Sequence, residues 1–318
     1  MKPWIALPIA LLLAAGAHGE NYPARPLRLV IPYAPGGPVD IVGRVVGLKL
    51  TEALGQQVIV DNRAGAGGNI ALEIVAKAAP DGYTLLMGAN GPIAINPSLY
   101  RRMPVDTVKD FAPVTMVASS AMILVAHPSL PAHSVKELIA LAKAHPGMIN
   151  YASSGSGSTA HLASELFKNM AGVQMVHVPY KGAGPALADL VSGQVQTMFT
   201  GISSTLPYVK SGKLQALAVS SEKRLPILPD VPAVAETLPG YEVTTWYGVF
   251  LPAGAPAGVI DRLHDALAQA LNSADTRQRL AALGADPRVN TPREFAAAIR
   301  SELEKWAAII KVSGARVD

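Results

Sequence analysis

Residues 27–54 read LRLVIPYAPGGPVDIVGRVVGLKLTEAL, and this stretch decides the class of the fold. The apolar run 27–33 has the length of a buried strand. Pro38 stands where a first-turn proline is favoured, so we predict a helix from Pro38 to about Leu54. Strand, glycine-rich turn and helix in this order indicate an α/β fold with mostly parallel strands.

The same alternation continues along the chain. The pattern predicts further strands at 57–61, 83–88, 114–118, 123–126, 148–152, 175–178, 197–199 and 216–219, and helices at 71–79, 135–144, 160–170 and 183–192. From 256 to 311 the pattern is almost wholly helical, with helices at 259–271, 276–283 and 292–312, and Gly284 is a plausible C-cap. Residues 225–240 hold four prolines, which predicts an extended surface loop.

The composition bounds the possible functions. The chain has 318 residues, which suggests two domains, and its 50% hydrophobic and 16% charged content excludes a disordered protein. A net charge of +4 without a basic run makes nucleic acid an unexpected partner. The absence of cysteine excludes disulfides, thiolate metal sites and a cysteine nucleophile. The seven histidines form no tight cluster, so neither a metal site nor a cofactor is expected.

The N-terminus has the pattern of a secretory signal peptide. Lys2 precedes a short apolar run over residues 4–15 and then small residues, and we expect cleavage after Ala17 or Gly19. The run is shorter than the roughly 20 residues that a membrane span needs. A buried N-terminal helix is the alternative. We therefore assign residues 1–19 to a signal peptide and expect an exported protein.

Two loops carry most of the functional signal. In residues 33–40, two glycines let the backbone approach a ligand, and the helix start beyond them presents free N–H groups suited to a carboxylate. Residues 153–159 hold five hydroxyls in seven positions ahead of a second helix, which favours a binding loop over a flexible linker. The first segment could also be an ordinary strand-to-helix turn.

Two further segments, 88–92 and 200–204, also follow predicted strands. Ligands of open α/β sheets lie beyond the carboxyl ends of the strands, so we expect such loops to converge. His161 falls in the first turn of a predicted helix, where a hydrogen-bonded structural role is expected rather than that of a base.

Enzyme motifs are missing from the sequence. It contains no Gly-x-Ser-x-Gly elbow, no His-Glu-x-x-His, no phosphate-binding Gly-Lys-Ser/Thr and no Gly-x-Gly-x-x-Gly. A triad of a serine between 153 and 158 with His161 and Asp40 can be drawn on paper, which leaves a serine hydrolase as the least favoured alternative. We expect a binding protein and not an enzyme.

A set of motifs in a fixed order resembles a known family. They are Tyr22-Pro23, the run 32–37 with Asp40, DNRAGAGG at 61–68, APDGYTL at 79–85, SGSG at 154–157 with His161-Leu162, VPYKG at 178–182, WYG at 246–248 and PAG at 252–254. Together they resemble the substrate-binding receptors of tripartite tricarboxylate transporters, the Bug-type periplasmic receptors. The resemblance covers about residues 21–314.

The resemblance implies a type II periplasmic binding protein fold, in which two α/β lobes joined by two crossovers close on a ligand. Carried over, lobe 1 takes residues 20–120 plus 246–318 and lobe 2 takes residues 121–245, with crossings near 117–124 and 244–247. It also implies a monomeric periplasmic receptor that delivers a small carboxylate to the membrane subunits of a transporter. A sensor of the same fold, signalling to a membrane partner, is the main alternative.

In the family, backbone N–H groups and ordered waters hold a carboxylate at the first loop and at the serine-rich loop. Where many relatives read Phe-Asp-Asn-Ile-Pro-Ser, this chain has Phe-Thr-Gly-Ile-Ser-Ser at 199–204, which removes a carboxylate that can meet a ligand ammonium. We therefore expect a di-, tri- or aromatic carboxylate without an amine. The candidate ligand-binding residues are Tyr33, Ala34, Pro35, Gly36, Gly37, Asp40, Asn90, Ser153, Ser154, Gly155, Ser156, Gly157, Ser158, His161, Lys181, Thr200 and Gly201.

Overall fold

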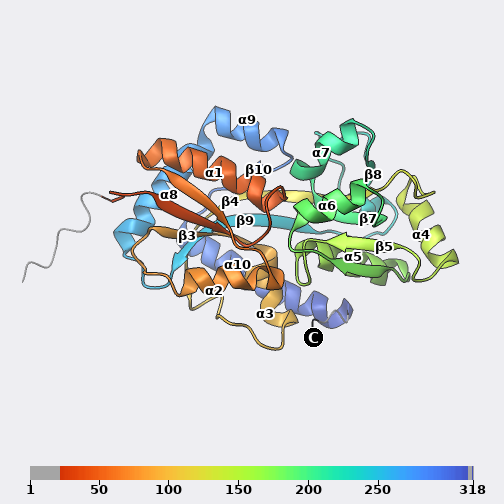
Figure 1. Cartoon of the computed structure of the whole chain (residues 1–318), viewed down its shortest axis with the longest axis horizontal. Coiled ribbons are helices and arrows are strands. Elements are labelled where there is room, and N and C mark those ends of the chain that lie inside the picture. The colour runs from red at the N-terminus through yellow and green to blue at the C-terminus, as the bar shows by residue number, and fades with distance from the viewer. Residues whose placement is uncertain (1–21, 314–316, 318) are drawn as a thin grey trace, which may run out of the picture.

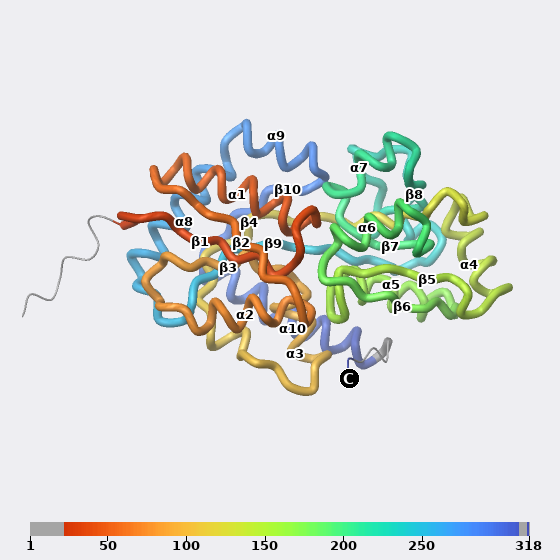
Figure 2. Tube along the Cα trace, viewed as in Figure 1, coloured from red at the N-terminus to blue at the C-terminus, as the bar shows by residue number. Residues whose placement is uncertain are grey.

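The structure is a computed structural model that describes residues 22–313 and Val317; the expected signal peptide lies outside these residues. Two α/β halves lie side by side and share one sheet, whose strands run through both (Figures 1 and 2). The strand order is β2-β1-β3-β9-β4-β7-β5-β6, and β8 and β10 also pair with β4. The strands are β1 (Leu27–Ile31), β2 (Val58–Asn62), β3 (Thr84–Ala89), β4 (Phe111–Ala126), β5 (Asn150–Ser153), β6 (Val176–Pro179), β7 (Thr197–Gly201), β8 (Gln215–Val219), β9 (Thr244–Pro252) and β10 (Asp286–Pro287).

Helices cover both faces of the sheet (Figure 1), as expected for parallel strands that are buried on two sides. In the first half, β1 lies between parallel neighbours β2 and β3, and four of its five residues are buried. The helices are α1 (Pro38–Leu54), α2 (Asn69–Ala76), α3 (Asn96–Leu99), α4 (Val135–Ala144), α5 (Thr159–Ala171), α6 (Ala183–Val191), α7 (Ile202–Lys210), α8 (Ala257–Asn272), α9 (Ala274–Ala282) and α10 (Pro292–Ser313).

Strand β4 joins the two halves. Its 16 residues pair with β9 as far as Ala121 and with β7 and β8 from Met122 onward. Strand β9 begins at Thr244 and carries the chain back into the first half. The type II architecture with two crossover strands is therefore confirmed. The division into lobes at 120/121 and 245/246 remains a prediction.

Several predicted elements need correction. Residues 114–118 and 123–126 are one strand, because the hydroxyl-bearing residues between them continue the ladder with β9. Residues 200–204 are not a loop throughout, since α7 begins at Ile202. Residues 88–92 run directly into a π-helical turn, Gly91–Ile95. The segment 225–240 is not wholly on the surface, because Ala233 and Val234 are buried.

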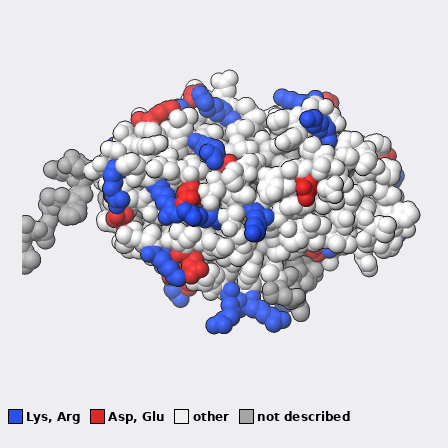
Figure 3. All heavy atoms as spheres, in the orientation of Figure 1, with Lys and Arg blue, Asp and Glu red and all other residues white. Residues whose placement is uncertain are grey.

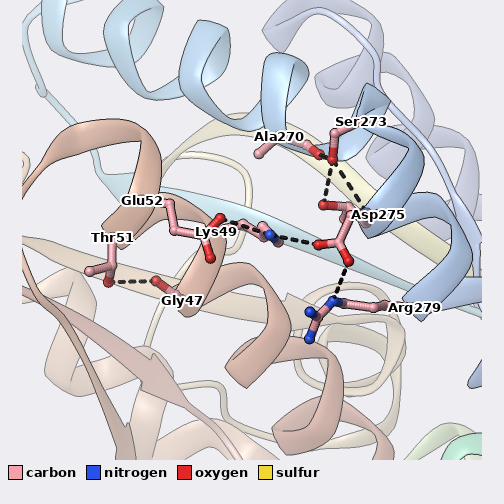
Figure 4. A network of polar contacts seen from close by, with 9 residues as sticks. Gly47, Lys49, Thr51, Glu52, Ala270, Ser273, Asp275 and Arg279 are labelled. Atoms are coloured by element: carbon pink, nitrogen blue, oxygen red, sulfur yellow. Dashed lines mark hydrogen bonds and ion pairs between the residues drawn. The ribbon is translucent and has the colours of Figure 1, made fainter.

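Helix α1, which starts at the first glycine loop, forms an ion pair with helix α9 of the C-terminal region. Lys49 of α1 forms ion pairs with Glu52, at 2.7 Å, and with Asp275 of α9, at 2.7 Å, and Arg279 holds the other side of Asp275 (Figure 4). These exposed pairs contribute little each, but they connect segments far apart in the sequence. No helix of the described residues is long and apolar enough to cross a membrane.

Candidate ligand-binding site

Four helices begin around one cavity of about 40 Å³ where the two halves of the molecule meet. Helix α1 comes from the first half, and α5, α6 and α7 come from the second (Figure 1). Strand β1 runs opposite to β5 and β7, and the two sets pair with different parts of the crossover strands, so their carboxyl ends face each other where the halves meet. The helices that follow these strands therefore begin around the same cavity. The cavity is lined by Tyr33, Gly37, Pro38, Val39, Ala89, Met122, Ser154, Thr159, Ala160, Ala183, Thr200, Gly201, Thr245 and Tyr247.

Three of these helices begin with an uncapped glycine. Gly37, Gly182 and Gly201 are the N-cap residues of α1, α6 and α7, and none of these helices has a side-chain cap hydrogen bond. The first N–H groups of a helix have no partner within the helix, and the positive end of its dipole lies there. Helix α5 differs, since Ser158 caps it by accepting a hydrogen bond from the His161 N–H at 3.2 Å. The arrangement therefore suits an anionic oxygen.

Among the described residues that line this cavity, none carries a charged side chain. Hydroxyls come from Ser154, Thr159, Thr200, Thr245 and the two tyrosines among its lining residues. Burial raises the pKa of Tyr33 and of Tyr247, so both phenols stay protonated and able to donate at neutral pH. An anion bound here would be held by N–H and O–H donors, without an ion pair.

Asp40 stabilises the first glycine loop through its side-chain carboxylate. Its carboxylate accepts hydrogen bonds from the Gly36 N–H, Arg44 Nε and Asn62 Nδ2, each at 3.0 Å. Burial raises the pKa of Asp40, but these hydrogen bonds outweigh burial and the net shift is downward. Asn62 also donates to the Tyr33 carbonyl at 2.9 Å. Asp40 thus positions the loop and does not line the cavity.

Two stacked histidines support the serine-rich loop. His177 Nε2 lies 2.6 Å from Ser153 Oγ, and the rings of His161 and His177 stack with centroids 4.1 Å apart. The Gly157 N–H donates to His161 Nδ1 at 3.3 Å, so this nitrogen is unprotonated. Burial lowers the pKa of His161 to about 4, and burial followed by the neighbouring His161 lowers the pKa of His177 to about 3.

The catalytic triad drawn on paper is not assembled. Asp40 is engaged by Arg44, Gly36 and Asn62, whereas His161 bonds Gly157 and stacks on His177. Among the described residues, no group of three metal-binding side chains comes together.

The two halves are in direct contact beside the cavity. The Ala34 N–H donates to the Lys181 carbonyl at 3.0 Å. A Cβ added at Gly184 would lie 2.1 Å from the Pro35 carbonyl oxygen, and one at Gly201 would lie 2.5 Å from Pro38. Glycine at these positions is therefore what allows the backbones to approach so closely.

Asn90 lies behind the site and connects three elements. Its Oδ1 accepts from Thr245 Oγ1 at 3.0 Å and from the Trp246 N–H at 2.6 Å, and its Nδ2 donates to Glu302 of α10 at 2.9 Å. Asn90 therefore holds the start of β9 in place. Its side-chain oxygen and amide hydrogens already form hydrogen bonds within the protein, so it is not a ligand-binding residue in this structure.

The candidate residues thus fall into groups. Tyr33, Gly37, Ser154, Thr200 and Gly201 line the cavity. Tyr33 and Ser154 also line a neighbouring cavity, together with Gly155, Ser156 and Lys181. The remaining candidates line neither cavity: Ala34, Pro35, Gly36, Asp40, Asn90, Ser153, Gly157, Ser158 and His161.

Sequence reasoning missed several lining residues. Met122, Thr245 and Tyr247 lie on the crossover strands, and Ala89 ends β3. Met122 and Thr245 reach the cavity through strand pairing between distant segments, which no local motif reports. Ala89 lies in the segment 88–92 and Tyr247 in the WYG motif, so these two segments did carry a signal. Ala183 was predicted to begin a helix but was not among the candidate site residues. It follows Gly182, the last residue of the VPYKG motif, and that motif was the signal that could have indicated it.

Comparison with known proteins identifies the family to which the chain belongs. Residues 42–315 match the profile of the tripartite tricarboxylate transporter family receptor. The chain belongs to this receptor family. The receptor is 38% identical over 307 residues to the protein BugT of Bordetella pertussis, which covers 96% of this chain and 94% of BugT.

Two solved structures show the same fold. The receptor matches R. palustris Rpa4515, solved with adipate, with a TM-score of 0.91, 37% identity and coverage of 93% of this chain and 100% of that chain. It matches MatC from Rhodopseudomonas palustris, solved with bound malate, with a TM-score of 0.87, 34% identity and coverage of 91% and 100%. The resemblance inferred from the motifs is therefore confirmed.

Proposed function

We propose that this receptor captures a small organic carboxylate in the periplasm and delivers it to the membrane subunits of a tripartite transporter, without a chemical step. The observation that carries the proposal is the convergence of four helix starts on one cavity whose described lining residues include six hydroxyl-bearing side chains and no charged one. Helix N-termini bind anions through N–H groups and the helix dipole.

The ligand carries no amine in this proposal. The described lining residues of the cavity include no aspartate or glutamate, and Thr200 provides a hydroxyl where a carboxylate would be needed to neutralise an ammonium. An ammonium transferred from water without such a partner is strongly disfavoured. Adipate and malate, found in two similar proteins, are acids of this amine-free kind and support the assignment.

Capture is coupled to closure of the two halves. The cavity wall contains Gly37 from one half and Ala183 from the other, and the Ala34–Lys181 backbone hydrogen bond closes beside it. A ligand that contacts both halves binds the closed arrangement more tightly than an open one, and this difference in affinity favours closure. The closed molecule would then present the surface that docks on the transporter.

The test is a calorimetric titration of the chain from residue 20 with malate, succinate, adipate, pimelate, citrate, benzoate, aspartate and glutamate. We expect at least one amine-free acid to bind and the two amino acids to bind far more weakly or not at all. Tight binding of aspartate or glutamate alone would overturn the assignment of ligand class. Binding of none of these acids would overturn carboxylate capture itself.

A further inference from the structure

A second, larger cavity adjoins the proposed carboxylate site. Its volume is about 330 Å³, and Tyr33 and Ser154 line both cavities. One wall is the glycine-rich turn Gly65 to Gly68 of the first half, and the opposite wall is formed by Ser154 to Ser156 and Pro179 to Lys181 of the second half. The two cavities therefore adjoin each other at Tyr33 and Ser154, as a first and a second compartment.

One lysine gives this second compartment its charge. Lys181 is the only charged residue among its described lining residues, and no acidic group of the described chain lies within ion-pair distance of its ammonium. The nearby basic side chains differ: Arg44 pairs with Asp40 and Arg63 with Asp61. Lys181 is exposed, so its ammonium is hydrated and available to a ligand.

The compartment exists because the two halves are in contact. A Cβ at Gly67 would lie 2.5 Å from the Ser156 carbonyl oxygen and 2.6 Å from Tyr100 Oη. Glycine at this position lets the turn of the first half close against the serine-rich loop of the second. A group bound in the second compartment therefore touches both halves, as does a group in the first.

We infer that the receptor selects dicarboxylates whose second carboxylate reaches the ammonium of Lys181 in this compartment, while the first carboxylate occupies the cavity at the four helix starts. The inference rests on the proposed function and specifies its substrate class. The linker of such an acid passes Tyr33 and Ser154, the two residues common to both compartments. Acids with closely spaced carboxylates are too short to occupy both positions.

The experiment compares chain lengths and end groups. The wild-type chain from residue 20 is titrated with the diacids malonate, succinate, glutarate, adipate and pimelate, and with the monoacids of equal length, propionate, butyrate, pentanoate, hexanoate and heptanoate. We expect affinity to rise along the diacids until the second carboxylate reaches Lys181, and the best diacid to bind about tenfold or more tightly than the monoacid of equal length. Equal affinity of each diacid and its matching monoacid would overturn the inference.

Substitution of Lys181 assigns the effect to the ammonium. Lys181→Met should weaken the diacids far more than the matching monoacids, because the ammonium is lost while the backbone carbonyl that accepts from Ala34 is retained. Lys213→Met is the matched control, since Lys213 is exposed in the same half and lines neither cavity. Equal weakening of monoacids and diacids by Lys181→Met would show that Lys181 acts on closure and would overturn the inference.

A charge reversal gives a gain of function that unfolding cannot mimic. Lys181→Glu should reject the diacids and bind an amino acid whose ammonium lies at the far end, such as 6-aminohexanoate, more tightly than wild type does. If Lys181→Glu still prefers the diacids, the distal site lies elsewhere. If no monoacid or diacid binds any variant, the proposed function fails, which is a result distinct from failure of the distal site.

Discussion

At the scale of single residues, Thr200 places an uncharged hydroxyl in the cavity wall. It is buried, lines the cavity beside the start of α7, and has only Ser204 Oγ, at 3.5 Å, near its own hydroxyl. Thr200→Asp would put a negative charge beside the bound carboxylate in a water-poor site, where like charges repel strongly. We expect about a hundredfold or greater loss of affinity for a plain acid at neutral pH, measured by calorimetry.

Thr200→Asn is the control, because it has nearly the same size as the aspartate without the charge. Its affinity should stay within about tenfold of wild type, and the melting temperatures of both variants show whether they fold. An Asp variant that folds and binds the acid as tightly as wild type would show that the carboxylate lies away from Thr200.

His161 makes stability depend on pH. Its pKa is about 4 in the folded protein against 6.5 for an ordinary histidine, because burial disfavours the charged form. The unfolded chain therefore binds more protons, and stability is lost as the pH falls from 6.5 towards about 4. Between pH 6.5 and 5 this one group should cost about 2 kcal/mol of the free energy of unfolding.

The measurement is urea unfolding of wild type and of His161→Gln at pH 7 and pH 5. The glutamine does not titrate, so the stability difference between wild type and variant should become smaller at pH 5. The same difference at both pH values would contradict the low pKa assigned to His161.

At the scale of elements, α6 limits how closely the two halves can approach. Gly184 lies in its first turn, where a Cβ would collide with the Pro35 carbonyl of the other half. Gly184→Ala suits the helix itself, since alanine has the higher helix propensity. We expect ligand affinity to fall about tenfold or more while the melting temperature of the ligand-free protein does not fall.

Gly258→Ala is the matched control, because Gly258 lies in the first turn of α8 and a Cβ there meets nothing within 4 Å. Both its ligand affinity and its melting temperature should equal or slightly exceed those of wild type. Unchanged affinity in Gly184→Ala would mean that binding does not require this close approach.

Elements with strong local signals were predicted well. Helices α1 and α4 begin and end where the pattern placed them, since a first-turn proline marks the start of one and an apolar stripe runs through the other. Helix α7 was missed because Pro207 lies inside it and its short run shows little periodicity. The strand β4 was split in two because its middle is polar, and only pairing with β9 makes it continuous.

The site was predicted only in part, because some of its residues have local sequence signals and others are placed by distant strand pairing. Both loops that open α1 and α5 carry glycine or hydroxyl signals, and each contributes to the cavity. Met122 and Thr245 have no local signal, because they reach the cavity through the crossing of two strands from distant parts of the chain. His177 was overlooked because its partnership with Ser153 is formed between neighbouring strands.

At the scale of the whole molecule, Asn90 connects the sheet, the returning crossover and the C-terminal helix. Asn90 is completely buried, and its side-chain amide forms hydrogen bonds with Thr245, Trp246 and Glu302. Asn90→Ala leaves these buried groups without their partner, which typically costs about 2–3 kcal/mol. We expect a loss of about that size in urea unfolding.

Asn272→Ala serves as the comparison, since Asn272 is exposed and its side chain only accepts a hydrogen bond from Arg277. Its free energy of unfolding should change by less than about 0.5 kcal/mol. If Asn90→Ala were equally mild, Asn90 would not hold the crossover.

The described residues form no continuous basic stripe on the face drawn in Figure 3. On the face drawn in Figure 3, basic and acidic side chains of the described residues lie next to one another over the left half, and much of the right half is uncharged. A face of this kind offers little general attraction for anions, so we assign recognition to the cleft.

The crystal structure of the protein with its tightest-binding acid tests the central claim most directly, because it shows where the carboxylate lies. The account predicts a carboxylate in the cavity at the starts of α1, α5, α6 and α7, within hydrogen-bond distance of backbone N–H groups or of waters bound to them, and with no arginine or lysine paired to it. A first carboxylate held by a cationic side chain, or a ligand bound outside this cleft, would contradict the account.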